Sequence, residues 1–438
     1  MSVTQSARPA SSYHVFSNDG GPTAITVRGA IVRAFALVAA FFALLIVSTL
    51  LIALSPTLSR SVTAFFIHTQ TGATPWNGSD PVNMVLVGLD EDAARAQTFP
   101  HTDTMLVLSV NPASDSVKML SIPRDTWVNI PGYGPDRIND AYGDGGPKLL
   151  IKTAEAVTQM PIRYYAIISF TGFQKVIDAA GGVTIDVQHA INDPTYPAPT
   201  GFGYAPLHIR AGVQHMNGKL ALEYVRTRHN DPLGDLGRNQ RQQQVLEALK
   251  SQMLSPLMVV RLPGFLQALG QAVKTNFPYS DLTYLARVIV TAPKSHQQRS
   301  ALNYADNAVS NYTTPGGAEV LLPNWPRIHA LTRAMFRDPR LATSSIEVLN
   351  GTGTSGQAAA MSTWLQACGF RVGSIGNAAS INFGHTEVIR NTAASGNNYV
   401  ARMASDLLQT PLLSRSMPGT SAPVVVIVGA DWNNPLQS

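Results

Sequence analysis

Cysteine is almost absent from this chain of 438 residues. It occurs once, as Cys368, so no disulfide can form within the chain and no zinc site can be built from cysteines. Cys368 lies in LQACGF, at the expected end of a helix, which favours a small buried residue over a catalytic thiol. An exported protein with a sufficiently large core folds without disulfides, so this scarcity does not exclude a place outside the cytoplasm.

Charge is also scarce, because charged residues make up 13% of the chain and hydrophobic residues 45%. This composition predicts packed domains and argues against wholesale disorder. The formal net charge of +5 is too small to indicate nucleic acid as a partner, which needs a concentrated basic face. A local cluster of positive charge remains compatible with an anionic partner.

Several catalytic signatures are missing as well. The sequence contains no GxSxG elbow and no GxxxxGK[ST] phosphate loop, and its ten histidines show no HExxH spacing. A serine-hydrolase elbow, a P-loop and a zinc-protease motif are therefore not supported by the sequence.

One long apolar run is present, at residues 34–54. It carries no charge, and a helix of this length crosses the ~30 Å hydrocarbon core of a bilayer. A cleaved signal peptide is the alternative, but its apolar region is usually ~7–15 residues long. Arg8, Arg28 and Arg33 precede the run and only Arg60 follows closely, which predicts a cytoplasmic N-terminus. We therefore expect a single-pass cell-membrane protein whose remainder folds outside the cytoplasm.

Apolar strands and amphipathic helices alternate beyond this run, which predicts an α/β fold with three layers, α/β/α. Nearly continuous apolar strands are expected at 82–88, 104–110 and 117–122. They are followed by helix 147–160, strand 164–170, helix 172–182, strand 183–187, helices 217–229 and 238–254, and a further helical region to about 340.

A second, smaller α/β unit is expected after this domain. Its predicted order is strand 345–353, helix 355–368, strands 370–375 and 386–390, helix 397–408 and strand 423–429. The expected organisation is a cytoplasmic tail at 1–33, the transmembrane helix at 34–54, a tether at 55–80, a catalytic domain at 81–340 with its motif core at 81–255, and a C-terminal domain at 343–433.

Arginines gather at strand ends and in glycine-rich turns, where α/β folds place functional groups. They are Arg124, Arg137, Arg226, Arg228, Arg238 and Arg241. Arginine binds phosphate oxygens through a planar, permanently charged fork. Surface pairing with a nearby carboxylate is the alternative for each arginine taken singly.

The spacing of two pairs supports an anion site. Arg226 and Arg228 are two apart and face the same way on an extended stretch. Arg238 and Gln242 share a helix face that apolar residues continue, so a cation there is costly unless it meets an anion. The first turn of that helix also offers free N–H groups.

Two carboxylates lie close to these arginines in the predicted fold. Asp90 ends one strand and Asp103 opens the next, so they meet at one sheet edge if the strands are neighbours. Two carboxylates together with substrate phosphates form an ordinary Mg²⁺ site. Alternatively, Asp103 caps a turn and Asp90 merely ends its strand.

These blocks, in this order, resemble the LytR-CpsA-Psr family of bacterial cell-wall phosphotransferases. The resemblance runs from about residue 81 to 255 and is carried by SIPRDTWVNIPG, DRINDAYGDGG, FTGFQKVIDAAGGVTIDV, HMNGKLALEYVRTRHND and DLGRNQRQQ. Residues 345–432 also resemble the LytR C-terminal domain, through VLNGTGTSGQA and VVVIVGADW.

The resemblance implies a membrane-anchored enzyme that transfers a phosphorylated glycan from a polyprenyl pyrophosphate carrier to peptidoglycan. It implies that Asp90 and Asp103 bind Mg²⁺, and that a pyrophosphate clamp is formed by Arg124, Arg226, Arg228, Arg238 and Gln242, with Arg137 and Arg241 as further substrate-binding residues. We expect Arg124, Arg226, Arg228 and Asp103 to be catalytic. Many members have arginine where this chain has His101, so one phosphate contact is in doubt.

Several alternatives remain open. Asp103 or Asp235 is a candidate proton acceptor, and neither is preferred. The helices at 147–160 and 172–180 are candidate walls of a lipid site in the apolar interior. A pyrophosphate hydrolase, or a non-catalytic regulator that binds lipid or wall polymer, would use the same clamp.

Overall fold

The computed structural model describes residues 74–89, 102–196, 198, 203–227, 234–396 and 398–436. The chain divides into two compact units, Met1–Leu51 and Ile52–Ser438, and every described residue belongs to the second. The apolar run at 34–54 therefore lies outside the described residues. Among the helices that are described, none is long and apolar enough to cross a bilayer.

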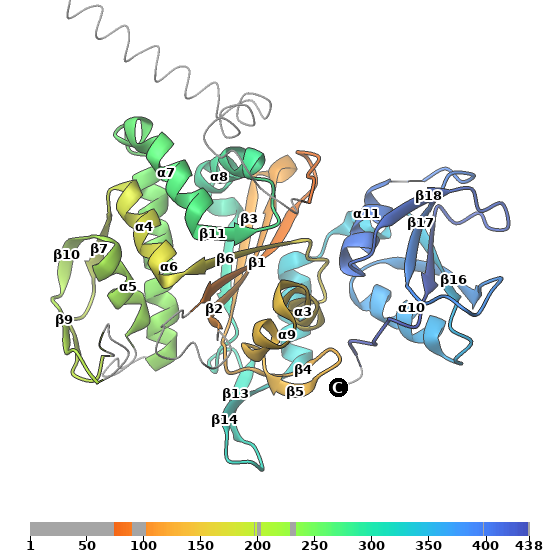
Figure 1. Ribbon diagram of the computed structural model, residues 1–438, viewed down its shortest axis with the longest axis horizontal. Helices are drawn as coiled ribbons and strands as arrows, with labels where there is room; N and C mark the ends of the chain where they lie inside the picture. Colours follow the sequence, from red (N-terminus) through yellow and green to blue (C-terminus); the bar gives the residue numbers. More distant parts are fainter. Residues whose placement is uncertain are drawn as a thin grey trace, which may run out of the picture. The chain divides into compact units, whose positions relative to one another are not determined.

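A six-stranded mixed sheet forms the centre of the first domain (Figure 1). Its strands, in the order in which they lie, are β11 (Val273–Thr275), β6 (Tyr164–Ser169), β1 (Val82–Leu89), β2 (Thr102–Asn111), β3 (Ser116–Ile122) and β12 (Gln297–Ala301). β1, β3 and β6 run in one direction, because β1 is parallel to β6 and both β1 and β3 are antiparallel to β2. The α/β prediction is confirmed, and so are the first three predicted strands.

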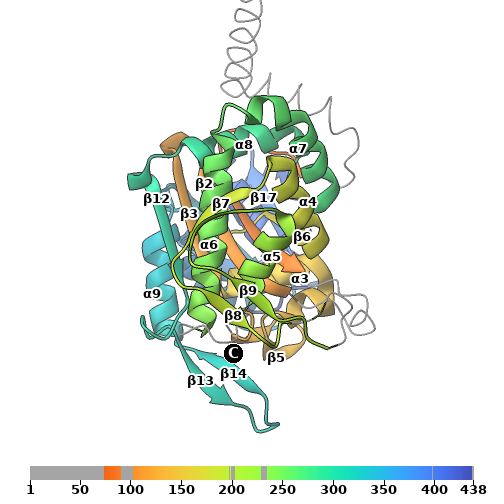
Figure 2. The same ribbon diagram turned by 90° about the vertical axis from the view of Figure 1, so that its left-hand side faces the viewer.

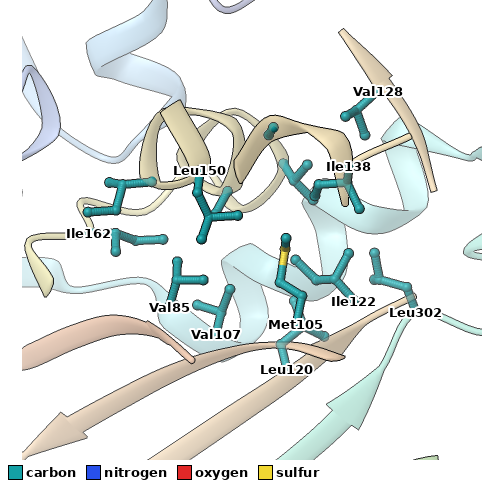
Figure 3. Close-up of a cluster of buried hydrophobic side chains, with 14 of the residues drawn as sticks. Val85, Met105, Val107, Leu120, Ile122, Val128, Ile138, Leu150, Ile162 and Leu302 are labelled. Carbon is teal, nitrogen blue, oxygen red and sulfur yellow. The ribbon is translucent and has the colours of Figure 1, made fainter. Parts of the chain in front are cut away.

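One face of the sheet packs against α3 (Asp140–Thr158) and α9 (Trp325–Phe336). Figure 3 shows Val85, Val107 and Leu120 from the strands opposite Leu150 of α3. These four side chains are fully buried, so this cluster is the main core of the domain. α3 is kinked at Gly145 and Gly146, whose backbone angles are non-helical.

The opposite face is covered by a different set of helices (Figure 1). They are α4 (Phe170–Ala180), α5 (Gly218–Arg226), α6 (Gly234–Met253), α7 (Met258–Ala272) and α8 (Leu282–Thr291). α4 packs on α7 around Val176 and Phe265. Nearer the sheet, Phe277 and Leu285 pack on Met84 and Leu108.

Four pairs of short strands lie outside the central sheet. β7 (Val183–Val187) pairs with β10 (Gly212–Met216), and β8 (Ile191–Asp193) pairs with β9 (Leu207–Ile209). β4 (Trp127–Ile130) and β5 (Gly134–Arg137) form a hairpin after β3. β13 (Val309–Thr313) and β14 (Glu319–Pro323) form a second hairpin, which projects from the body in Figures 1 and 2.

The predicted helical region up to about residue 340 was only partly right. Helices α7, α8 and α9 lie in it, but so do strands β11, β12, β13 and β14. β12 reads QQRSA, and pairing with β3 makes it a strand despite its polar sequence.

The C-terminal region holds a separate five-stranded sheet in the order β16-β15-β19-β17-β18. Its elements are β15 (Ser345–Asn350), α10 (Gln357–Ala367), β16 (Arg371–Asn377), β17 (Glu387–Asn391), α11 (Asn398–Leu407), β18 (Leu412–Arg415) and β19 (Val424–Val428). The prediction missed only β18. Cys368 is buried beside Trp364 and Leu365, which supports the structural reading of this thiol.

Candidate active site

Some of the predicted site residues follow elements that meet at one end of the six-stranded sheet, which is called the edge here. β1, β3 and β6 end at this edge, and the antiparallel strand β2 begins there. Leu89, the last residue of β1, pairs with Thr102, the first residue of β2, so Asp103 lies in β2 beside the end of β1. Functional groups of α/β proteins lie beyond the carboxyl ends of strands, and Arg124 follows the carboxyl end of β3.

The turn after β3 brings two of the predicted arginines together. Arg124 Nε donates to Asp125 Oδ2 over 3.3 Å, and Arg137 Nε lies 3.6 Å from Asp125 Oδ1. One carboxylate therefore orients both guanidinium groups. The exposed fractions of the Arg124 and Arg137 side chains are 22% and 36%, so both retain access to solvent.

The sequence PRDT builds this turn locally. The buried Thr126 hydroxyl donates to the Pro123 carbonyl over 2.6 Å, and the Thr126 amide donates to the same oxygen. The Arg137 Nη2 atom donates to the Glu319 carbonyl over 2.9 Å, and the Leu321 amide donates to the Asp125 carbonyl. The β13–β14 hairpin thus braces both arginines through its backbone.

Arg226 approaches the same edge from the last turn of α5. Its guanidinium carbon lies 4.0 Å from the centre of the Phe170 ring, which is close enough for a cation–π interaction. Phe170 follows β6 directly and begins α4, whose N-cap Ser169 accepts from the Gly172 amide. Burial raises the pKa of Tyr196 to about 12, although the nearby positive charge of Arg226 opposes this shift.

Arg241 is buried and is held by the end of α5. Its Nε donates to the Tyr224 carbonyl over 2.8 Å, and its Nη2 donates to the Thr227 carbonyl. These contacts fix the segment that carries Arg226 and leads to Arg228. They give Arg241 a positioning role, and its predicted contact with substrate stays a prediction.

The remaining predicted residues are described only in part. α6 begins at Gly234, one turn earlier than predicted, so its free N–H groups belong to residues that precede Arg238. Gln242 lies on the side of α6 that faces an apolar cavity. Asp90, His101 and Arg228 lie outside the described residues, and the side chains of Asp103, Asp235 and Arg238 are not described.

That cavity has a volume of about 380 Å³ and lies between the sheet and helices α4 to α8. Leu86, Leu106 and Ile168 form its floor on β1, β2 and β6. Phe173 and Leu246 line it from α4 and α6. Its lining is almost entirely hydrophobic, which suits an apolar ligand.

The cavity also corrects one expectation about its walls. Helix 172–180 was a candidate wall and lines the cavity as part of α4. Helix 147–160 was the other candidate, but α3 packs on the opposite face of the sheet. Phe170 also lines the cavity. Its ring therefore contacts the apolar cavity and the guanidinium group of Arg226.

The predicted metal ligands are Asp90 and Asp103. Asp103 enters β2 where β1 ends, and carboxylate oxygens are the ligands that a hard divalent cation prefers. Among the side chains that the structure describes, no three of His, Cys, Asp and Glu gather as a metal site. Both predicted ligands fall outside that set, so Mg²⁺ binding stays a prediction.

Sequence reasoning missed three residues that shape the site. Asp125 could have been identified from the sequence, because it follows Arg124 directly in SIPRD and its carboxylate can form an ion pair with that arginine. Phe170 and Tyr196 gave no such signal, since their contacts with Arg226 depend on tertiary packing.

Comparison with known proteins gives two family matches. Residues 59–322 match the model of the LytR_cpsA_psr family. Residues 343–432 match a model described as LytR cell envelope-related transcriptional attenuator. The first match covers more than half of the chain.

Two curated relatives illustrate the similarity. The first is a protein of Oceanobacillus iheyensis named polyisoprenyl-teichoic acid–peptidoglycan teichoic acid transferase TagU. The chain is 41% identical to it over 212 residues, which cover 47% of the chain and 62% of that protein. It is 36% identical over 218 residues to a Staphylococcus aureus protein named regulatory protein MsrR, covering 49% of the chain and 62% of that protein. The chain thus spans less than two thirds of the length of these relatives.

A solved structure is similar in part. The crystal structure of Bacillus subtilis TagV aligns with a TM-score of 0.49 and 26% identity, over 59% of this chain and 96% of that one.

Proposed function

The chain belongs to the LytR-CpsA-Psr family, and on this premise we propose that it transfers a phosphorylated glycan from a polyprenyl pyrophosphate carrier to peptidoglycan. The proposed substrates agree with the name of the TagU relative, polyisoprenyl-teichoic acid–peptidoglycan teichoic acid transferase.

One observation carries the proposal: the guanidinium group of Arg226 lies against the wall of an apolar cavity. Arg226 stacks on Phe170 at 4.0 Å, and Phe170 is part of the cavity wall. A polyprenyl pyrophosphate likewise has an apolar part and a charged part, because a long hydrocarbon chain is joined to a doubly charged head. The hydrocarbon chain of the carrier would lie in the cavity. Its pyrophosphate would lie against Arg226, Arg124 and Arg137.

The arginines of this edge would stabilise charge during the reaction. A peptidoglycan hydroxyl attacks the phosphorus that carries the glycan, its proton passes to a base, and polyprenyl phosphate leaves with the electrons of the broken P–O bond. Phosphoryl transfer depends on alignment and charge neutralisation more than on covalent help from the protein. Asp103 and Asp235 remain the two candidate bases.

Magnesium would be held by Asp90 and Asp103, where it would neutralise phosphate charge. Arg228, Arg238 and Gln242 would complete the clamp, with Arg241 holding the end of α5 in place. The helix at 34–54 would anchor the chain in the membrane that contains the carrier, with the catalytic domain outside the cytoplasm.

The test is a reconstitution of the full chain in lipid nanodiscs with glycan-linked polyprenyl pyrophosphate and purified peptidoglycan. The proposal predicts glycan covalently attached to the wall and release of polyprenyl phosphate. Free phosphoglycan without wall attachment would instead identify a hydrolase. Binding of the carrier without any turnover would identify a non-catalytic regulator.

A further inference from the structure

Helix α6 presents two chemically different faces. Gln242, Val245, Leu246 and Leu249 face the apolar cavity. On the other side, residues at helical spacing line a second, polar groove: Gln240, Gln243, Gln244, Glu247, Ala248 and Ser251. The same helix therefore separates an apolar site from a polar one.

The opposite wall of the groove comes from β7, which crosses α6 in Figure 2. Val183, Ile185 and Val187 are buried in the core. Successive side chains of a strand point to opposite faces. Thr184, Asp186 and Gln188 therefore lie on the exposed outer face of β7, and they line the groove. Polar side chains of both elements thus border one open space of about 570 Å³.

The lining consists mostly of groups that both donate and accept hydrogen bonds. Four of its side chains are glutamines, namely Gln188, Gln240, Gln243 and Gln244. Among the lining residues that the structure describes, Arg299 is the one cation, and it is paired with Glu247. Phosphate would meet little free positive charge here, whereas an apolar chain would have to desolvate many amides. A polyhydroxyl ligand suits the lining best, because neutral amides exchange hydrogen bonds with hydroxyls at a small desolvation cost.

The groove and the candidate site share helix α6. Gln240 precedes Arg241, and Gln244 accepts a hydrogen bond from the hydroxyl of Tyr224, whose carbonyl is bound by Arg241. A ligand in this groove therefore lies along the same helix as the clamp.

We propose that the groove between α6 and β7 binds a saccharide strand that takes part in the transfer reaction. The inference rests on the proposed function for the role of that strand, and it adds where the glycan binds. The strand is either the glycan of the donor or the acceptor strand of peptidoglycan, since both offer the same hydroxyl and amide chemistry.

The first test measures binding alone. The full chain in nanodiscs is titrated with soluble N-acetylglucosamine oligomers and, separately, with farnesyl pyrophosphate. The Gln240→Ala/Gln243→Ala variant should bind the oligomer about tenfold more weakly, because it loses hydrogen bonds from two side chains. Its affinity for farnesyl pyrophosphate should be unchanged. The matched control is Gln298→Ala, an exposed glutamine next to Arg299 that does not line the groove, and it should bind both ligands normally.

The second test separates the two sources of the strand in the transfer assay. A raised KM for peptidoglycan with an unchanged KM for the donor supports the acceptor strand, and the converse supports the donor glycan. Unchanged binding of the oligomer and unchanged KM values in the double variant would overturn the inference and leave the proposed function intact. Groove-dependent binding of the oligomer without any transfer by the parent would refute the proposed function and leave the groove as a saccharide site.

Discussion

Replacing Ala166 by leucine tests whether the apolar cavity holds the carrier chain. Ala166 lies on β6 between Leu86 and Thr275, and its side chain lines the cavity. The substitution adds the equivalent of about three methylene groups to a space that the protein leaves open, so the ligand must give up a similar length of buried chain.

The magnitude follows from the value of buried hydrocarbon. Each buried methylene contributes about 0.8 kcal/mol, so the loss is about 2.4 kcal/mol. This corresponds to about 50-fold weaker binding, since 1.4 kcal/mol is a factor of ten. The midpoint of thermal unfolding should not fall, because the new atoms fill existing space and do not overpack the core.

The assay is titration of the full chain in nanodiscs with farnesyl pyrophosphate, alongside a thermal melt. Ala166→Ser is nearly isosteric and serves as the control, with expected affinity close to that of the parent. Ala286→Leu places the same bulk on the α8 wall and should weaken binding to a similar degree. Parental affinity in both leucine variants, with normal melting, would refute the assignment of this cavity to the carrier chain.

Three further predictions concern the edge of the sheet and a buried carboxylate. Asp125→Ala should lower kcat/KM by about tenfold to a hundredfold, because Arg124 and Arg137 lose the carboxylate that orients them. The magnitude follows from the loss of one charged hydrogen bond, which is worth ~1.5–3 kcal/mol. Arg241→Ala should destabilise the fold by about 3 kcal/mol in a urea titration, since it leaves buried carbonyls without a donor. Asp406→Asn should flatten the pH dependence of the melting temperature between about pH 4 and 6.

The sign of the last prediction follows from burial. Burial raises the pKa of Asp406 to about 6, while the contact with Arg163 at 3.2 Å opposes the shift. The folded state therefore holds this proton more tightly than the unfolded state, whose pKa is about 3.9. Asp406 does not change the free energy of unfolding below pH ~4, where it is protonated in both states. Above that pH its contribution lowers the free energy of unfolding, by up to about 3 kcal/mol once the pH has passed 6. A pH slope in the Asp406→Asn variant equal to that of the parent would contradict this account.

Controls sharpen the first two of these predictions. Asp125→Asn keeps the shape of the side chain and a hydrogen-bond acceptor, so it should lose less activity than Asp125→Ala. Arg241→Ala should lose stability before any substrate is added. A variant that melts like the parent but has lost activity would show that the Arg241 contacts with α5 are not its main role.

The strands of the central sheet were predictable because their sequences carry their own signal. VNMVLVGL and VKMLSI are nearly continuous in apolar residues, as strands buried on both faces must be. β12 and β13 carry no such signal. β12 is a polar edge strand that exists because it pairs with β3, and β13 has a single buried residue, Val309.

The candidate site was predictable in composition and less so in arrangement. The arginines stood out because they recur in one set of motifs, although Arg226 and Arg241 lie on helices α5 and α6. The role of Arg241 was not readable from spacing, since its guanidinium turns toward the carbonyls of Tyr224 and Thr227. The choice of α4 over α3 as a cavity wall likewise depends on which face of the sheet each helix covers.

The most direct measurement follows the two phosphorus atoms of the donor separately. The full chain in nanodiscs is given peptidoglycan and a donor labelled either at the phosphorus that carries the glycan or at the phosphorus that carries the lipid. The account predicts that the first label is recovered in the wall, attached to the glycan, and that the second leaves as polyprenyl phosphate. Recovery of the first label in soluble phosphoglycan, or of wall-attached glycan without phosphorus, would contradict it.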